Sequence, residues 1–196
     1  MGHIVPWTDG TWTNQPVDVR SHAGGLHVTA RQGSDAWRIT SYGFIHSTEH
    51  ALLTTLEPES ALEVQFRLDY ADQFDQAGIF VKVDDESWIK AGVEVSDGEA
   101  SLGAVVTRGR SDWSLSPVPD WVGRLVTVRG SWSGDALTVR ARVDDEPWRL
   151  VRVAPLDADA DVTAGPYCCA PTRAGLTIHF TAWRTTAPDA RLHPEV

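Results

Sequence analysis

The stretch WIKAGVEVSDGEASLGAVV, residues 88–106, decides the fold class of this chain. Apolar side chains alternate with polar or small ones on both sides of the dipeptide Asp97-Gly98. A period of two is typical of a β-strand with one buried face, and Asp-Gly is a strong signal for a two-residue hairpin turn. The stretch therefore predicts two antiparallel strands joined by a tight turn.

The same alternation extends through the rest of the chain. LHVTARQ (26–32) and LEVQFRLDY (62–70) place apolar residues on one face, and similar segments recur between clusters of Gly, Pro, Asp and Ser. No segment keeps a helical spacing of apolar residues for three turns, although a short helical turn is expected near Tyr70–Phe74. We expect one all-β domain over residues 1–196, with two antiparallel sheets packed face to face.

Charge and cysteine usage restrict the partners and the compartment. The chain has 27 Asp and Glu against 17 Lys and Arg, a formal net charge of −10. This charge repels phosphates and anionic lipids, so we expect no nucleic acid and no membrane as partner, whereas neutral sugars are compatible. No signal peptide and no apolar membrane span is recognised. Adjacent Cys168 and Cys169 are expected to be reduced strand residues that face opposite ways, which favours a cytoplasmic location.

An acidic segment that ends in tryptophan occurs twice, as VDDESW (83–88) and VDDEPW (143–148). A calcium loop needs six or more oxygen ligands at alternating positions and usually a glycine, which neither copy provides. We expect two hairpin turns whose Asp side chains bind turn amides, with the tryptophan opening the return strand. No metal site and no cofactor is expected.

The strand that begins at Trp88 provides the candidate site. Alternation places Trp88, Lys90, Gly92 and Glu94 on the face opposite the core. An indole that stacks on a sugar ring, and charged groups that bond hydroxyls, suit a carbohydrate groove in which Gly92 leaves room for the ligand. The alternative is a surface Lys90–Glu94 ion pair beside a tryptophan that shields the hairpin.

Four longer stretches together resemble the DUF1349 family. They are SDAWRITSYGF (34–44), FDQAGIFVKVDDESWIKAGVEVSDG (74–98), VVTRGRSDWS (105–114) and AGPYCCAPTRAGLTIHF (164–180). The resemblance implies a concanavalin A-like β-sandwich (jelly roll) of the lectin/glucanase superfamily, similar to the sandwich domain appended to some β-xylosidases. One departure is Ala36, which replaces the aromatic residue usual between the Asp and Trp of the first stretch and so removes a stacking position.

The resemblance also implies a set of ligand-binding residues. Seven polar and aromatic residues match the family pattern: Asp75, Gln76, Trp88, Lys90, Glu94, Asp112 and Trp113. For Asp75 and Asp112 the alternative role is a hydrogen bond that stabilises a turn.

Three functions follow as expectations. The first is a non-catalytic carbohydrate-binding-like module, or an accessory protein of sugar metabolism, that binds a neutral oligosaccharide or a small sugar. The second is a glycoside hydrolase-like enzyme in which Glu94 is the catalytic residue and works with a second carboxylate such as Asp75 or Asp112. The third, implied by the family's enolase-regulating relative, is a protein that binds a metabolic enzyme. Exposed edge strands would also permit a homodimer.

Overall fold

Strands β10 (Ser87–Ser96) and β11 (Glu99–Arg108) form the hairpin expected from residues 88–106. Its turn consists of Asp97 and Gly98, with φ angles of 55° and 83°. Positive φ at both central residues is the geometry of a type I′ turn, whose twist matches that of the flanking strands. The strands are paired from Ser87–Arg108 at one end to Ser96–Glu99 at the other.

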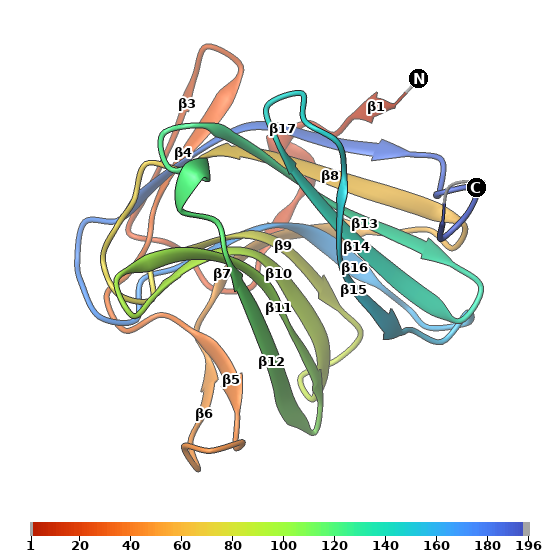
Figure 1. The fold of residues 1–196 in the computed structure, drawn as a ribbon, viewed down its shortest axis with the longest axis horizontal. Coiled ribbons are helices and arrows are strands. Elements are labelled where there is room, and N and C mark those ends of the chain that lie inside the picture. Colours follow the sequence, from red (N-terminus) through yellow and green to blue (C-terminus); the bar gives the residue numbers. More distant parts are fainter. Residues whose placement is uncertain (1, 194–196) are drawn as a thin grey trace.

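The computed structural model describes residues 2–193, and most of its strands form two antiparallel sheets that pack face to face (Figure 1). The eight-stranded sheet has the order β15 (Arg149–Pro155), β14 (Ala136–Val143), β13 (Leu125–Ser133), β8 (Ser60–Arg67), β17 (Thr177–Thr186), β4 (Gly25–Thr29) and β3 (Asp18–His22), with β1 (His3–Ile4) paired to β17. The seven-stranded sheet has the order β12 (Arg110–Pro117), β11, β10, β9 (Gln76–Lys82), β16 (Thr163–Cys169), β7 (His50–Thr55) and β2 (Thr11–Trp12). The expected concanavalin A-like β-sandwich is confirmed.

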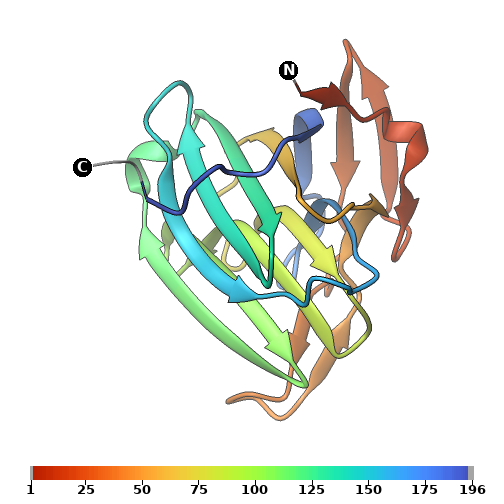
Figure 2. The ribbon, with the colours of Figure 1, turned by 90° about the vertical axis from the view of Figure 1, so that its right-hand side faces the viewer.

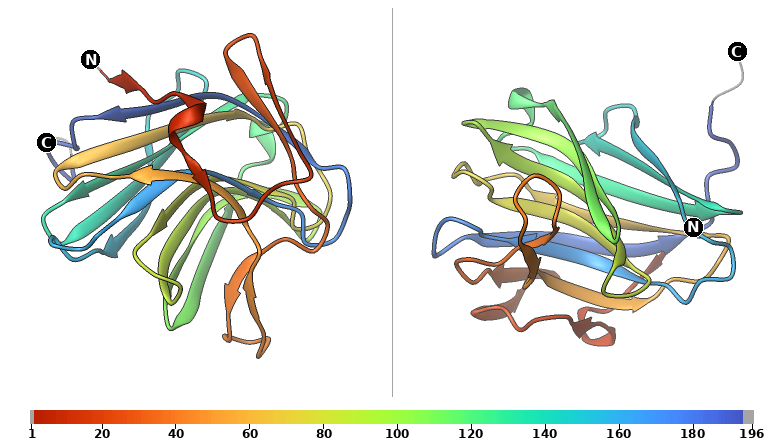
Figure 3. Two further views of the ribbon diagram at one scale, coloured as in Figure 1. Left: turned by 180° about the vertical axis from the view of Figure 1, so that it is seen from behind. Right: turned by 90° about the horizontal axis from the view of Figure 1, so that it is seen from below.

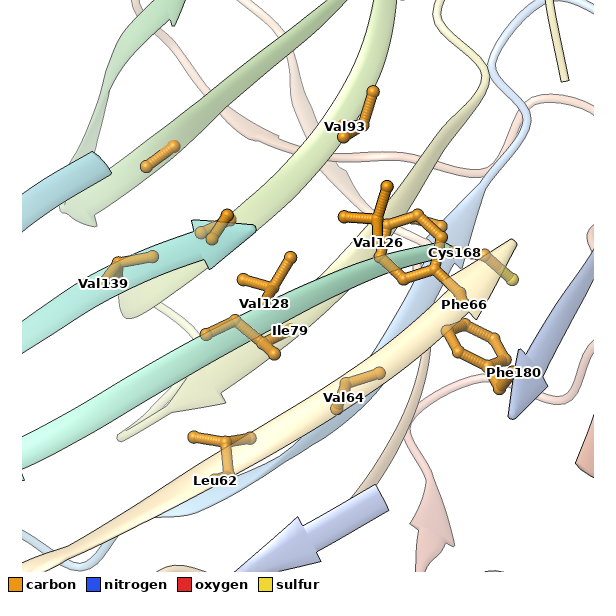
Figure 4. Close-up of a cluster of buried hydrophobic side chains, with 14 of the residues drawn as sticks. Leu62, Val64, Phe66, Ile79, Val93, Val126, Val128, Val139, Cys168 and Phe180 are labelled. Atoms are coloured by element: carbon orange, nitrogen blue, oxygen red, sulfur yellow. The ribbon is translucent and has the colours of Figure 1, made fainter. Parts of the chain in front are cut away.

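Apolar side chains fill the space between the two sheets (Figure 4). Phe66 and Val128 come from the eight-stranded sheet, and Ile79 and Val93 come from the seven-stranded sheet. All four are at most 1% exposed, because the period of two directs every second residue of each strand inward. Apolar surface removed from water contributes roughly 25 cal/mol per Å², so this layer is the main source of stability.

A second apolar cluster covers the opposite, outer face of the seven-stranded sheet. Over this face lies a separate hairpin made of β5 (Ala36–Arg38) and β6 (Ile45–Ser47), seen in front of the sheet in the right-hand view of Figure 3. The cluster consists of Ala36, Trp37, Ala51, Leu53, Phe80, Trp88, Val105, Tyr167 and Cys169. Cys168 belongs to the inner core, so the expectation that the two cysteines face opposite ways is confirmed.

The segment that follows β17 runs across the eight-stranded sheet on the side away from the core (Figure 2). Arg129 of β13 holds it, donating from Nε to Asp189 over 2.8 Å and from Nη2 to the Ala187 carbonyl over 2.8 Å. Arg140 of β14 also donates to Asp189. The sandwich is therefore covered differently on its two outer faces, by a strap of chain on one and by the β5–β6 hairpin on the other.

The expected helical turn at Tyr70–Phe74 is wrong. Residues 70 and 71 are irregular, residues 72–74 form a bend and a turn, and Phe74 has a φ of 64°, which a right-handed helix does not permit. Tyr70 is buried, and its hydroxyl donates to the Val93 carbonyl over 2.7 Å, which fixes this segment against β10 instead. Short 3₁₀ turns occur at η1 (Trp7–Asp9) and η2 (Pro119–Trp121). Within residues 2–193, no helix is long and apolar enough to cross a membrane.

Both acidic segments are turns between neighbouring strands. Residues 83–86 join β9 to β10, and the Glu86 amide donates to Asp84 Oδ1 over 2.7 Å, as expected. In the second copy, which joins β14 to β15, Asp144 accepts from the Leu125 amide of β13. Trp148 precedes β15 by one residue and lies against Arg142 at 4.5 Å. Among the described residues, no group of three or more His, Cys, Asp or Glu side chains is placed to hold a metal ion.

Candidate functional site

A cavity of about 370 Å³ lies between the outer face of the seven-stranded sheet and the β5–β6 hairpin. Its floor comes from the sheet, one wall from the hairpin, and the rest from the loop before β9 and the loop after β16. The lining residues are Gly33, Asp35, Trp37, Tyr42, Phe44, His46, Phe74, Gln76, Lys90, Glu94, Val105, Trp113, Pro171 and Thr172. Six of these fourteen residues carry aromatic rings, and several polar side chains converge, which is the usual make-up of a small-ligand site.

The register of the sheet brings the floor residues together. Gln76 of β9 is paired with Glu94 of β10, and Lys90 of β10 is paired with Val105 of β11. Val105 is in turn paired with Trp113 of the edge strand β12. Directly paired residues in neighbouring strands point to the same face, so four strands contribute to one floor.

Glycines stand in register beside these residues. Gly92 of β10 is paired with both Gly78 of β9 and Gly103 of β11. A Cβ atom on Gly92 would lie 2.0 Å from the Ala77 carbonyl oxygen, so the close backbone approach itself requires glycine. A consequence is that the floor next to Glu94 carries no side chain across three strands.

The hairpin wall is a series of touching aromatic rings. Trp37 lies edge-on to Trp113 of the sheet, with ring centroids 6.1 Å apart, and also contacts Tyr42. Tyr42 stacks on Phe44 at 5.3 Å, and Phe44 contacts His46. Tyr42 is 56% exposed and Phe44 is 42% exposed, so this wall presents large apolar surfaces to solvent. An exposed group of aromatic side chains marks an interaction site in a folded protein.

Arg38 fixes the hairpin to the sheet. Its guanidinium donates to Glu86 over 2.6 Å and to the Gly109 carbonyl over 3.3 Å. Its backbone amide donates to Ser111 Oγ over 2.9 Å. Glu86 belongs to the first acidic turn, so that turn also serves as an anchor for the wall of the cavity.

Lys90 carries a buried charge at the base of the cavity. It is 3% exposed, and its Nζ donates to Asp35 Oδ1 over 2.9 Å and to Gln76 Oε1 over 2.8 Å. Burial is the largest single effect and disfavours the ammonium form, but the combined attraction of Asp35, Cys169 and Glu94 outweighs it, so the pKa of Lys90 is raised. The side chain is therefore charged, and its partner is Asp35 rather than Glu94.

Glu94 differs from Asp35, Lys90 and Gln76, which bond one another, because it takes no part in their hydrogen bonds. Within residues 2–193 its carboxyl group accepts no hydrogen bond and forms no ion pair, although it is only partly exposed. Burial raises its pKa to about 7, against the attraction of Lys90 and with a further contribution from Asp35. Both protonation states are therefore well populated near neutral pH.

The remaining sequence-predicted residues lie elsewhere. Asp75 is completely buried and forms a two-pronged ion pair with Arg173, with N–O distances of 2.6 and 2.9 Å. Asp112 is exposed and pairs with Arg152 on the other side of β12. Trp88 shares the outer face but stacks on Phe80 with ring centroids 5.3 Å apart.

Trp88 lines a different hollow, of about 640 Å³, beside the first acidic turn. The polar residues that line this hollow are largely exposed and charged. The hollow therefore lacks the fixed, buried polar groups of a small-ligand site.

The cavity brings together Gln76, Lys90, Glu94 and Trp113 from the predicted set. Asp35, Trp37, Tyr42, Phe44 and His46 were not predicted as site residues, although most lie in the stretch SDAWRITSYGF that carries the family resemblance. The spacing of its aromatic residues was the available signal. Nothing in the local sequence shows that this stretch folds back over a distant sheet.

Two packed antiparallel sheets, with an aromatic-walled cavity on the outer face of one of them, define the chain as a β-sandwich protein. The chain belongs to the DUF1349 family, described as proteins of unknown function, whose family model matches residues 12–188. It is 39% identical over 183 residues to "Regulation of enolase protein 1" of Saccharomyces cerevisiae, covering 92% of this chain and 91% of that protein.

Solved structures agree with this assignment. A functionally unknown protein from Saccharomyces cerevisiae matches with a TM-score of 0.88 and 35% identity, over 95% of this chain and 100% of that chain. Xylan β-1,4-xylosidase from Bacillus halodurans C-125 matches with a TM-score of 0.66 and 14% identity, over 84% of this chain and 33% of that chain. The second likeness concerns the fold alone.

Proposed function

We propose that the chain binds a small neutral saccharide in the cavity between the β5–β6 hairpin and the sheet. The observation that carries this proposal is the combination, in one cavity, of aromatic faces with the hydrogen-bonded group Lys90–Asp35–Gln76. Sugars present apolar C–H faces and a rim of hydroxyls, so rings and fixed polar groups together suit them. A volume of about 370 Å³ is at the small end of the range for ligand pockets, roughly 300–1,000 Å³, and so favours one or two sugar units.

Charge supports a neutral ligand over an anionic one. The charge of Lys90 is already neutralised by Asp35, and the chain as a whole carries a formal charge of −10. A phosphate or carboxylate ligand would meet no free cation at the base of the cavity and would be repelled by the overall field.

Titration calorimetry with a panel of monosaccharides and disaccharides tests the proposal. Trp113→Ala should weaken binding about tenfold, or roughly 1.4 kcal/mol, because a stacking face is lost from a side chain that is already 37% exposed. The matched control is Trp148→Ala, which removes an indole that lies outside the cavity against Arg142. Absence of heat with every sugar, or equal weakening by both variants, would contradict the proposal.

A glycoside hydrolase-like activity is a second candidate, favoured by one observation. Glu94 is protonated in part near neutral pH, and a carboxylate, Asp35, lines the same cavity and interacts with it electrostatically. Such a pair is required for acid–base cleavage of a glycosidic bond. Release of reducing ends from xylo- or gluco-oligosaccharides that is lost in Glu94→Gln would support this function. Binding without any turnover would leave only the first proposal.

A regulator of a metabolic enzyme is a third candidate, favoured by the 39% identity to "Regulation of enolase protein 1". The exposed tip of the β5–β6 hairpin would be the contact, and Ile45, which is 51% exposed and does not line the cavity, separates it from sugar binding. Purified enolase should then bind the chain in sedimentation experiments, and Ile45→Ser should abolish that binding while sugar affinity is kept.

A further inference from the structure

The charges around the cavity do not balance. Asp35 and Lys90 neutralise each other at 2.9 Å, and Gln76 is satisfied by Lys90 and by the Phe74 carbonyl. Ionised Glu94 then leaves one negative charge without a partner among the described residues. Half-buried carboxylates are costly unless a donor or a cation compensates them. The bound ligand is the remaining candidate for that donor.

The surroundings of Glu94 suit a cation from solvent. Glu94 and Trp113 line both the main cavity and a small hollow that continues from it over Gly92 and Gly103. Access to the carboxyl is from the main cavity, since the small hollow, of about 10 Å³, has room for one water molecule at most. Trp113 and the exposed rings of Tyr42 and Phe44 present aromatic faces, which attract cations with about 0.5–2 kcal/mol in favourable geometry.

The basic side chains near the cavity are engaged in other contacts and do not neutralise Glu94. Lys90, the cation that faces the cavity base, is bound by Asp35 and Gln76, and their contacts would have to break before it turned to Glu94. His46, on the hairpin wall, contacts Phe44. Arg173, in the loop after β16, is held by Asp72 and Asp75.

We propose that the preferred ligand of this cavity is a cationic amino sugar, with its ammonium group on the Glu94 carboxylate and its ring against Trp113. This inference rests on the proposed saccharide function, and it replaces the neutral sugar of that proposal with a cationic one as the preferred ligand. Ligand binding would exchange the water at Glu94 for a charge-assisted hydrogen bond, which is stronger than one between neutral groups. The Lys90–Asp35 pair would remain intact and bond the sugar hydroxyls.

Calorimetry with matched sugar pairs tests this inference. The probes are glucose and glucosamine, galactose and galactosamine, and mannose and mannosamine, with N-acetylglucosamine as the uncharged amide, at pH 7.5 and low salt. In at least one pair the amino sugar should bind about tenfold more tightly than its neutral counterpart, and the amide should bind like the neutral sugar. Glu94→Gln keeps the size of the side chain and should bring the ratio of amino-sugar to neutral-sugar affinity down to about one.

The outcomes separate the two proposals. Equal affinities within every pair, or a preference that persists in Glu94→Gln, would overturn the amino-sugar assignment and leave saccharide binding in place. Absence of binding by all of the sugars would overturn both. A variant that fails to fold is recognised by its thermal transition, and Glu94→Asp, which retains the charge, should then keep a preference for the amino sugar.

Discussion

At the scale of single residues, Lys90 shows how a buried charge is made tolerable. Its ammonium group is 3% exposed and bonds Asp35 and Gln76, so all three side chains depend on one another. Lys90→Met should remove the cation and leave Asp35 without its partner. We expect a loss of roughly 3–5 kcal/mol in the free energy of unfolding, measured by urea denaturation.

Lys82→Met is the matched control for this change. Lys82 pairs with Asp85 in an exposed turn, and exposed pairs contribute only about 0–1 kcal/mol. If both variants lose the same free energy of unfolding, the buried hydrogen bonds of Lys90 do not make the large contribution to stability that is expected.

Glu94 should make stability depend on pH in an unusual direction. Its pKa is raised from an ordinary value near 4.5 to about 7, so between these limits the folded chain binds a proton that the unfolded chain has released. Stability therefore falls as pH rises from about 4.5 to 7 on account of this group, by at most about 3 kcal/mol. The free energy of unfolding of Glu94→Gln should rise relative to that of the wild type as the pH increases over this interval, as measured by unfolding at several pH values. A constant difference between the two would contradict the raised pKa.

At the scale of elements, the β5–β6 hairpin supplies the wall that makes a cavity on the outer face of the sheet. Its connection contains Ile39, Ser41 and Gly43 with φ angles of 66°, 62° and 75°, a conformation that costs energy in residues with a Cβ atom. Contacts with the rest of the molecule therefore stabilise the hairpin. Trp37 packs in the outer cluster, and Arg38 donates to Glu86 and Gly109 in the neighbouring turns.

Arg38→Ala should loosen the hairpin without unfolding the sandwich. We expect faster amide hydrogen exchange over residues 36–47 and weaker ligand binding, with a small change in the thermal midpoint, because the inner core is untouched. Arg20→Ala is the control, since Arg20 forms an exposed pair with Asp18 on β3. Unchanged exchange in the Arg38 variant would show that Trp37 alone fixes the hairpin.

At the scale of the whole molecule, the sandwich could be predicted because its determinants are local. Each strand carries its own period of two, and Asp97-Gly98 defines a turn by itself. The same rule identified Lys90 and Glu94 as residues of one face. It could not tell that Asp75 forms an ion pair with Arg173, because that partner is 98 residues away in sequence. The pairing of Lys90 with Asp35, 55 residues away, is of the same kind.

Adjacent Cys168 and Cys169 lie on β16 with their side chains in different layers of the molecule, one between the sheets and the other beneath the hairpin wall. Burial raises the pKa of both thiols, so both should react slowly with an alkylating reagent while the chain is native. Mass spectrometry of partially alkylated chains should find Cys169 modified first when the hairpin alone lifts, and both modified together when the sheets separate. Two neighbouring atoms of sulfur thus provide the molecule with a built-in gauge that distinguishes the opening of its binding face from the collapse of its interior.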